Sequence, residues 1–248
     1  MRRPHVAVCA AFLAACSSTE KPPAAPPPAP HDMAITGADF AFTAPDTIPA
    51  GLTHVTFENK GTMLHHVQFV RLDSGKTFAD LAEALKHPGA PPAWAVVVPG
   101  PNAPDPGGTS NATVDLAAGA YGILCFVDIP GGVPHFAKGM MRALTVRASE
   151  GAAAAAADSA DVQVVLADYS FKLSRPLTSG AHVIEVTSRG PQEHELEIVR
   201  FAPGKTLEDL ATWMAKPEGP PPANAIGGTS GQLPGTTVRF SVDLTPGN

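Results

Sequence analysis

The sequence has few charged residues and few large aromatic ones. Charged side chains make up 16% of its 248 residues, the formal net charge is −6, and it contains two tryptophans and two tyrosines. No basic face for nucleic acid is therefore expected. The chain also lacks His-x-His pairs, Cys-x-x-Cys pairs and a Gly-x-Ser-x-Gly elbow. Because these patterns mark catalytic metal centres, thiol redox sites and hydrolases, we expect a protein that is not an enzyme.

Long apolar runs are missing as well. The run from Val6 to Ala15 follows Arg2 and Arg3 and is far shorter than the roughly 20 residues of a membrane-spanning helix, which predicts a signal peptide over residues 1–15. Its end, Leu13-Ala14-Ala15-Cys16, resembles the bacterial lipobox, which implies a lipid on Cys16; the alternative is an ordinary secretory signal with a chance cysteine. The Pro/Ala-rich residues 16–32 then form a tether. We expect a lipoprotein anchored to a membrane of the cell envelope, facing the periplasm or the exterior.

Cysteine is scarce, and this makes one position informative. Of the three cysteines, Cys9 leaves with the signal peptide and Cys16 carries the lipid, so only Cys125 remains in the folded protein. A lone cysteine in an oxidising compartment has no internal disulfide partner. Cys125 is therefore either a small buried side chain or a residue with a chemical role.

The chain contains two related halves. Asp39-Phe40-Ala41-Phe42 recurs as Asp168-Tyr169-Ser170-Phe171, an offset of 129 that also relates Gly61 to Gly190, His65 to His194, Arg71 to Arg200, and Gly75-Lys76-Thr77 to Gly204-Lys205-Thr206. Gly107-Gly108-Thr109-Ser110 recurs as Gly227-Gly228-Thr229-Ser230, and Val114-Asp115-Leu116 as Val242-Asp243-Leu244. We interpret this as a duplicated domain, with copies at 33–148 and 161–248 and an alanine-rich linker at 149–160.

The second copy is incomplete. It ends at Asn248, which aligns with Ala120, so it has no counterpart of the segment from Tyr121 onward. Two predicted strands are missing from it, and an incomplete sandwich leaves strand edges open. We expect that the sequence is a fragment of a longer protein; the alternative is that a partner strand completes the copy.

The pattern within each copy favours strands. The 27 prolines and 23 glycines suit many short strands with turns. Strands are predicted at Thr53–Glu58, His65–Arg71, Tyr121–Val127 and Ala143–Val146, and a short helix within Thr77–Lys86, in a long connection. Along the second of these strands His65, Val67 and Phe69 share one face, and His66 and Gln68 share the other. The fold class is therefore all-β, an antiparallel β-sandwich.

Four residues form a candidate metal site: His65, Cys125, His135 and Met140. Two imidazoles and a thiolate with a weak axial thioether are the ligands of a mononuclear blue copper site. The recurrence of His65 as His194, where His66 becomes Glu195, favours His65 over His66. Met140 follows Gly139 and is favoured over Met141, which we interpret as a packing residue on the opposite face. His194 has no cysteine or methionine downstream, so no copper site is expected in the second copy.

The motifs around these residues resemble the cupredoxin family of plastocyanin- and azurin-like blue copper proteins. Asn59-Lys60-Gly61 followed by His65-His66-Val67-Gln68-Phe69 is similar to the strand with the first ligand. Gly119-Ala120-Tyr121-Gly122-Ile123-Leu124-Cys125 resembles the penultimate strand, and Pro134–Met140 followed by Leu144-Thr145-Val146 resembles the final loop and strand. The resemblance implies a Greek-key β-sandwich, one type 1 copper ion bound by His65, Cys125, His135 and Met140, and one-electron transfer with a redox partner protein.

One departure from the family bears on the metal. Nine residues separate Cys125 from His135, whereas plastocyanin-like proteins have two to four. Asp128-Ile129-Pro130-Gly131-Gly132 is typical of a turn, and an outward excursion there returns His135 to the site. If the insertion instead tilts His135 away, the alternative is a metal-free cupredoxin-like module that binds a partner or ligand.

Overall fold

A computed structural model describes residues 29–87, 91–149 and 157–247 of the chain. The predicted signal peptide, the lipidation site at Cys16, most of the tether and part of the linker lie outside these ranges. Within them, no helix is both long and apolar enough to cross a bilayer.

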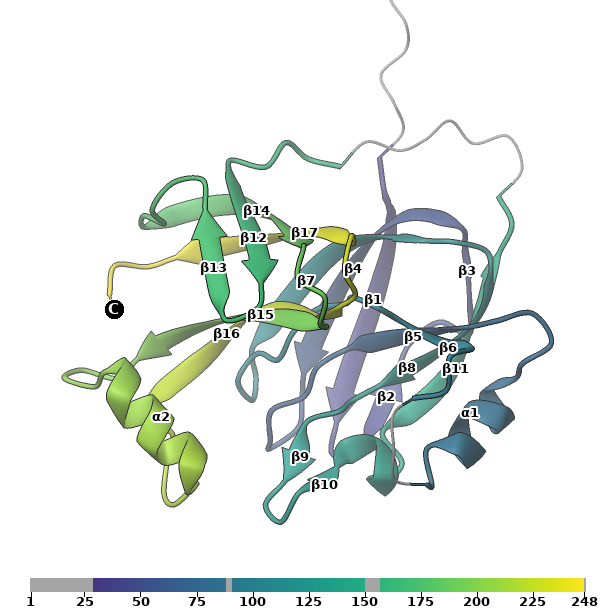
Figure 1. The fold of residues 1–248 in the computed structure, drawn as a ribbon, viewed down its shortest axis with the longest axis horizontal. Coiled ribbons are helices and arrows are strands. Elements are labelled where there is room, and N and C mark those ends of the chain that lie inside the picture. The colour runs from purple at the N-terminus through teal and green to yellow at the C-terminus, as the bar shows by residue number, and fades with distance from the viewer. Residues whose placement is uncertain (1–28, 88–90, 150–156, 248) are drawn as a thin grey trace, which may run out of the picture.

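The first half is built almost entirely from short strands (Figure 1). It contains β1 (His31–Ala38), β2 (Ala41–Thr43), β3 (Thr47–Pro49), β4 (Gly51–Asn59), β5 (Gln68–Leu72), β6 (Ala95–Val98), β7 (Thr109–Leu116), β8 (Gly119–Leu124), β9 (Asp128–Ile129), β10 (Val133–Pro134) and β11 (Met141–Arg147). A helix, α1 (Phe78–Ala84), lies between β5 and β6, and a 3-10 turn, η1 (His135–Lys138), precedes β11.

These strands form the predicted β-sandwich. One layer has the order β2-β1-β4-β7, and the other has the order β3-β11-β8-β5-β6. Most pairs are antiparallel, as expected, but β1 pairs parallel with β4 and β3 parallel with β11. Four predicted segments are confirmed as β4, β5, β8 and β11, although β5 starts at Gln68 and β8 ends at Leu124, so that His65 and Cys125 lie just outside the ladders.

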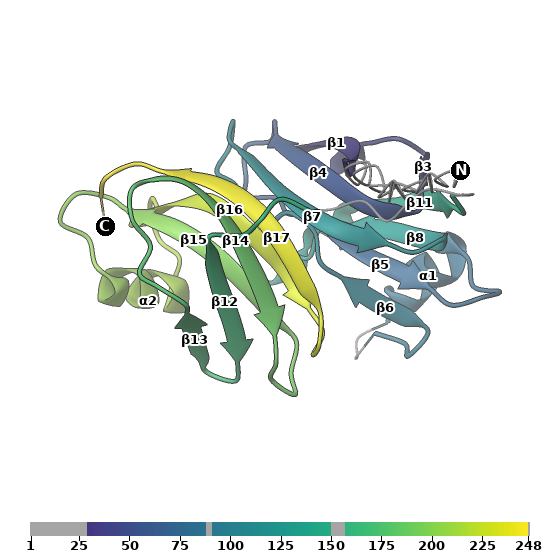
Figure 2. The same ribbon diagram turned by 90° about the horizontal axis from the view of Figure 1, so that it is seen from above.

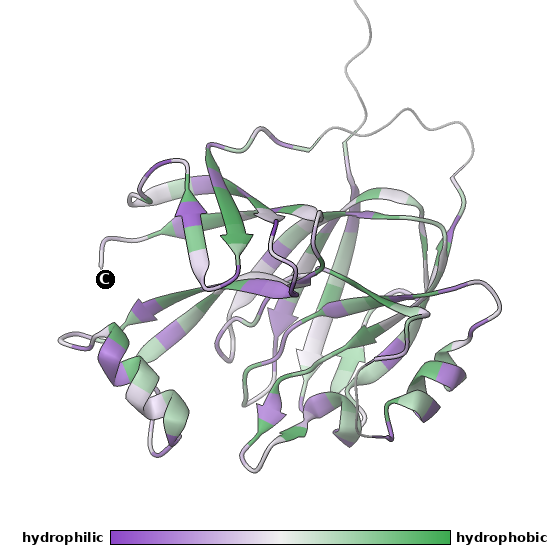
Figure 3. Ribbon diagram, in the orientation of Figure 1, coloured by the Kyte–Doolittle hydropathy of each residue, from purple (hydrophilic) through white to green (hydrophobic). Residues whose placement is uncertain are grey.

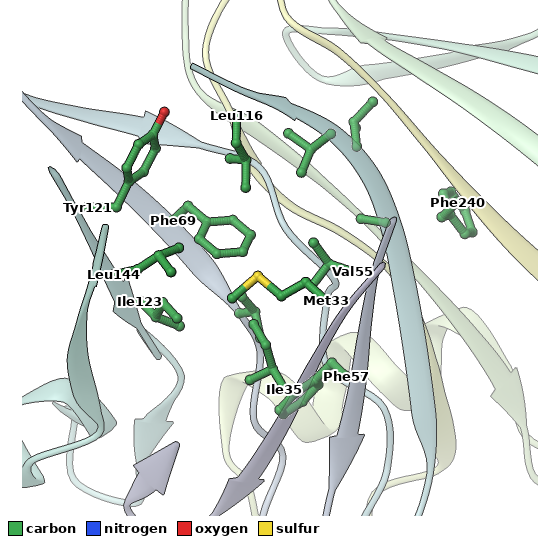
Figure 4. Close-up of a cluster of buried hydrophobic side chains, with 14 of the residues drawn as sticks. Met33, Ile35, Val55, Phe57, Phe69, Leu116, Tyr121, Ile123, Leu144 and Phe240 are labelled. Carbon is green, nitrogen blue, oxygen red and sulfur yellow. The ribbon is translucent and has the colours of Figure 1, made fainter. Parts of the chain in front are cut away.

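The core lies between the two layers (Figure 4). Alternate residues of β1 and β4 point inward, among them Met33, Ile35 and Phe57, each at most 2% exposed. They meet Phe69 and Ile123 of the opposite layer, which are fully buried. Burying each of these side chains contributes about 1.5–3 kcal/mol, so this interface dominates the stability of the first half.

The helix α1 covers the outer face of the second layer and confirms the predicted helix. Thr77 and Asp80 form a reciprocal capping box at its start. Its Leu81 is 1% exposed and packs with Val70 and Leu124, while the helix carries hydrophilic residues as well (Figure 3). Gly122 permits this contact, since a Cβ there would lie 2.8 Å from Leu81 Cδ2.

The second half repeats the first in part. It contains β12 (Val162–Ala167), β13 (Ser170–Leu173), β14 (Gly180–Ser188), β15 (His194–Phe201), α2 (Leu207–Ala215), β16 (Ala223–Gln232) and β17 (Thr237–Leu244). Its order β13-β12-β14-β17 matches β2-β1-β4-β7, and β12 pairs parallel with β14 as β1 does with β4. The strands β17 and β7 pair antiparallel at Arg239 and Thr113, so the two halves share one eight-stranded sheet (Figure 2).

The second layer of the second half consists of β15 and β16. In the first half, β8 pairs with one edge of β5. Within residues 157–247, the corresponding edge of β15 has no partner strand. Side chains that the missing strands would cover are exposed as a result: Phe42 is 8% exposed, whereas its counterpart Phe171 is 63% exposed. The incomplete second copy expected from the alignment is thus the one observed.

One part of the alignment was wrong. Gly227–Ser230 matches Gly107–Ser110 in sequence, but it lies in β16, which pairs with β15 as β6 pairs with β5. The structural counterpart of β7 is β17, because β17 pairs with β14 as β7 pairs with β4. A short Gly-Gly-Thr-Ser match carries little information about register, which strand pairing decides.

Candidate metal centre

Three of the four candidate ligands meet at one end of the first sandwich. The nitrogen and sulfur donor atoms of His65, Cys125 and His135 all lie within 4.8 Å of one another, and all three side chains are fully buried. His65 lies just before β5, and Cys125 directly follows β8. His135 is the first residue of η1. Among the residues that the structure describes, this is the one group of three or more such side chains placed to hold a metal ion.

The donor atoms face each other at distances that suit a single metal ion. His65 Nδ1 is 2.9 Å from His135 Nδ1, and Cys125 Sγ is 3.5 Å from His135 Nδ1. Ligands bound about 2.0–2.3 Å from a common metal lie roughly 3–4 Å apart. Two imidazole nitrogens and one sulfur in this arrangement fit the trigonal set that suits copper.

Met140 lies beside the cluster. It is fully buried, and its N–H donates to His135 O at 3.1 Å while its carbonyl accepts from Cys125 N–H at 3.2 Å. Met140 belongs to the core between the layers, whereas Met141 packs against Val70 and Leu81 on the other face. The expected difference between the two methionines is therefore observed.

The long Cys–His connection folds outward and closes on itself. β9 and β10 form a small hairpin whose tip contains Gly131 and Gly132, both with positive φ. At its base, His135 N–H donates to Val127 O at 2.8 Å, and Phe136 N–H donates to Cys125 O at 2.9 Å. The extra residues leave the site as a hairpin, and His135 returns beside Cys125.

Asp39 orients the first histidine, a role that the sequence reasoning missed. Asp39 Oδ1 is 2.6 Å from His65 Nε2. A carboxylate accepts, so His65 carries its proton on Nε2 and turns the lone pair of Nδ1 toward Cys125 and His135. Hydrogen bonds from Thr62 and then from His65 hold the pKa of Asp39 at about 2. The signal was present in the recurrence of Asp39 as Asp168 at the same offset as the histidines.

Burial controls the protonation of the other donors. It raises the pKa of the Cys125 thiol to about 11, although backbone N–H groups of His66 and Val127 point at the sulfur and oppose this shift. It also lowers the pKa of His135, as does the nearby His65. A metal ion must therefore displace the thiol proton but meets an imidazole that is already neutral, so binding releases a proton.

His66 lies outside the donor cluster. Its imidazole Nε2 accepts the N–H of Phe126 at 2.9 Å, and burial lowers its pKa to about 4. The preference for His65 as the inward residue thus agrees with the structure.

The second half repeats the Asp–His pair, but Asp168 Oδ1 accepts no hydrogen bond, and among the described residues the other donors are not repeated. His194 Nε2 is 3.2 Å from Asp168 Oδ1, and His194 Nδ1, which corresponds to the metal-facing atom of His65, is buried without a hydrogen-bond partner. A glycine packs against the histidine of each pair. A Cβ on Gly61 would lie 2.5 Å from His65 Nε2, and one on Gly190 would lie 2.5 Å from His194 Cε1, so a side chain at either position would collide with the ring.

The placement of the donors on the strands identifies the fold. One histidine precedes β5, and the other candidate ligands come from the connection between β8 and β11, the last two strands, which pair antiparallel. The first half has a cupredoxin-like fold. The second half repeats its first layer and part of its second.

Comparisons with known proteins were made by sequence and by structure. No family model and no curated protein matches this sequence. An auracyanin from Roseiflexus castenholzii aligns with 23% identity over 48% of this chain and 98% of its own, with a TM-score of 0.32. Auracyanin A from Chloroflexus aurantiacus, a "blue" copper protein, aligns with 24% identity over 48% of this chain and 99% of its own, also with a TM-score of 0.32.

Larger proteins align across both halves. A copper-containing nitrite reductase from Thermus scotoductus aligns with 12% identity over 88% of this chain and 56% of its own, with a TM-score of 0.28. At such TM-scores these alignments add no weight, and the fold assignment rests on strand order and donor placement. The similar structures include enzymes, so they do not support the expectation that this protein is not one.

Proposed function

We propose that this protein binds one copper ion through His65, Cys125 and His135, with Met140 as the axial ligand, and carries single electrons at an extracytoplasmic membrane surface. The observation that carries the proposal is the convergence of two Nδ1 atoms and one sulfur in a fully buried cluster. When bound by such a set, copper changes between its cuprous and cupric states with little rearrangement of its ligands.

The surrounding residues supply what an electron carrier requires. Asp39 holds His65 in one tautomer, and the hydrogen bond from Cys125 N–H to Met140 O keeps the end of β8 in register with the start of β11. Burial excludes water from all three donors. A site held in this way keeps one geometry in both oxidation states, and outer hydrogen bonds of this kind tune a metal's affinity and potential.

Membrane attachment is the second part of the proposal. It is supported by the short apolar run after Arg2 and Arg3 and by the lipobox-like end at Cys16. We expect the protein produced in a bacterial host to fractionate with membranes and to incorporate a labelled fatty acid, and Cys16→Ala to lose both properties. Incorporation of label by Cys16→Ala would contradict the anchor.

The copper site is tested by adding Cu(II) to the purified protein. We expect one copper per chain, an intense blue thiolate-to-copper absorption, and a higher melting temperature, since a ligand at about 100 times its Kd adds about 2.7 kcal/mol. Cys125→Ser and His65→Ala should lose the colour. His194→Ala is the matched control in the second half and should keep it.

A colourless wild-type protein without copper-dependent stabilisation would reject the proposal and favour the metal-free binding module. That alternative was raised by the length of the Cys–His connection. The β9–β10 hairpin supports the copper proposal, because it accommodates the extra residues outside the site.

A further inference from the structure

The second half packs directly against the segment that carries His65. The contact is centred on Ser230 of β16, which is fully buried. Its hydroxyl donates to Val67 O at 2.9 Å and accepts the N–H of Gly100 at 2.8 Å, and its own N–H donates to Gly100 O at 2.9 Å. One side chain of the second half thus bonds to two main-chain segments of the first.

The segment from His65 to Val67 depends on these bonds because it precedes the ladder of β5, which starts at Gln68. Val67 N–H donates to Pro101 O at 3.0 Å, and Val67 O accepts from Ser230. The amide of Gln68 donates to Val98 O at 2.7 Å and to Gly231 O at 3.2 Å. The packing is close, since a Cβ on Gly100 would lie 2.4 Å from Val67 O.

The same segment also contacts the residue that follows Cys125. His66 directly precedes Val67, and its imidazole accepts the N–H of Phe126 at 2.9 Å. The second half also bonds to Asn102, the residue after Pro101, whose N–H donates to Gly228 O of β16 at 3.0 Å. A shift of Val67 therefore moves His65 directly and moves Cys125 through His66.

We propose that Ser230 is a positioning residue for the metal centre, and that the second half of the chain acts as a brace that sets the distance between His65 and Cys125. This inference rests on the proposed copper-binding function. It gives the second half a role that needs no metal of its own. Its alternative is that Ser230 only stabilises the contact between the halves.

The test compares Ser230→Ala with Ser188→Ala in the full chain. Ser188 is also fully buried in the second half, but its hydroxyl has no hydrogen-bond partner, so its replacement removes no bond. In the metal-free protein, alkylation of Cys125 under native conditions, followed by peptide mass spectrometry, reports opening of the site. We expect Ser230→Ala to raise this rate about tenfold, because a lost buried hydrogen bond favours local opening, and Ser188→Ala to leave it unchanged.

The copper-loaded proteins provide the second readout. We expect Ser230→Ala to shift the thiolate-to-copper absorption and the reduction potential, with both unchanged in Ser188→Ala. A lower melting temperature for Ser230→Ala with unchanged alkylation, absorption and potential would overturn the proposal and leave a purely structural role.

The outcomes separate this inference from the proposed function. If the wild-type protein binds no copper, the proposed function fails, while the alkylation contrast still decides whether Ser230 positions Cys125. If Ser230→Ala does not fold, Gln68→Met provides the test, since it removes the bond to Gly231 O from the other side, together with the bond to Val98 O within the first half. We expect a smaller rise in Cys125 alkylation for Gln68→Met, and an unchanged rate would overturn the brace.

Discussion

At the scale of residues, the chain contains the same Asp–His–Gly unit twice. Asp39, His65 and Gly61 form it in the first half, and Asp168, His194 and Gly190 form it in the second. Among the residues that the structure describes, only the first unit faces a cysteine and a second histidine. The unit itself is therefore a structural feature of the repeat. The cysteine and the second histidine beside it distinguish the candidate metal site of the first half from the second half.

This duplication offers a matched test of Asp39. Asp39→Asn removes the charge that fixes the tautomer of His65, and we expect copper affinity to fall about 10- to 100-fold, as for other partners of metal-bound histidines. Competition with a chelator of known affinity measures the change. Asp168→Asn is the control and should leave the affinity unaltered; equal losses in both variants would show that Asp39 acts only through the stability of the fold.

At the scale of elements, the β9–β10 hairpin explains how the long spacing between Cys125 and His135 is compatible with a compact site. The hairpin is two residues long on each side and is closed at its base by the bond from His135 N–H to Val127 O. Residues 128–134, which form the hairpin, contribute no donor to the cluster. The spacing in the sequence indicated the excursion, but only the closed base shows that His135 returns.

We predict that the hairpin is dispensable for the metal centre. Replacing residues 128–134 by a single glycine leaves three residues between Cys125 and His135, within the range of plastocyanin-like proteins. Because Val127 and His135 are already neighbours, the shortened protein should keep the blue absorption with one copper per chain. Loss of copper binding by a variant that still melts cooperatively would contradict this prediction.

At the scale of the whole molecule, the two halves share a sheet and a polar interface. Beside this interface, within the second half, the carboxylate of Glu197 in β15 accepts the N–H of Gly227 in β16 at 3.1 Å. Burial raises the pKa of Glu197 from 4.5 to about 8. Between these values the folded protein holds a proton that the unfolded chain has released, so the free energy of unfolding falls as the pH rises through this range.

We therefore expect Glu197→Gln to remove this fall in the free energy of unfolding with rising pH. The melting temperature of the variant should exceed that of the wild type by an amount that grows from about pH 5 to about pH 8. His66 has a lowered pKa and acts in the opposite sense at acidic pH, so the two proteins are compared at each pH. Glu208→Gln, at an exposed glutamate, is the control; a constant difference across the range would contradict the assignment.

The sequence by itself determined the repeat, four strands of the first half, the helix after Thr77 and the four candidate ligands, because alternation, turn residues and donor types are local properties. Only the tertiary structure decided that His135 reaches Cys125, that Asp39 orients His65, and that Ser230 bonds to Val67. Each of these is a contact between segments far apart in the chain. Such contacts depend on strand register and on how the layers stack, and no local pattern encodes them.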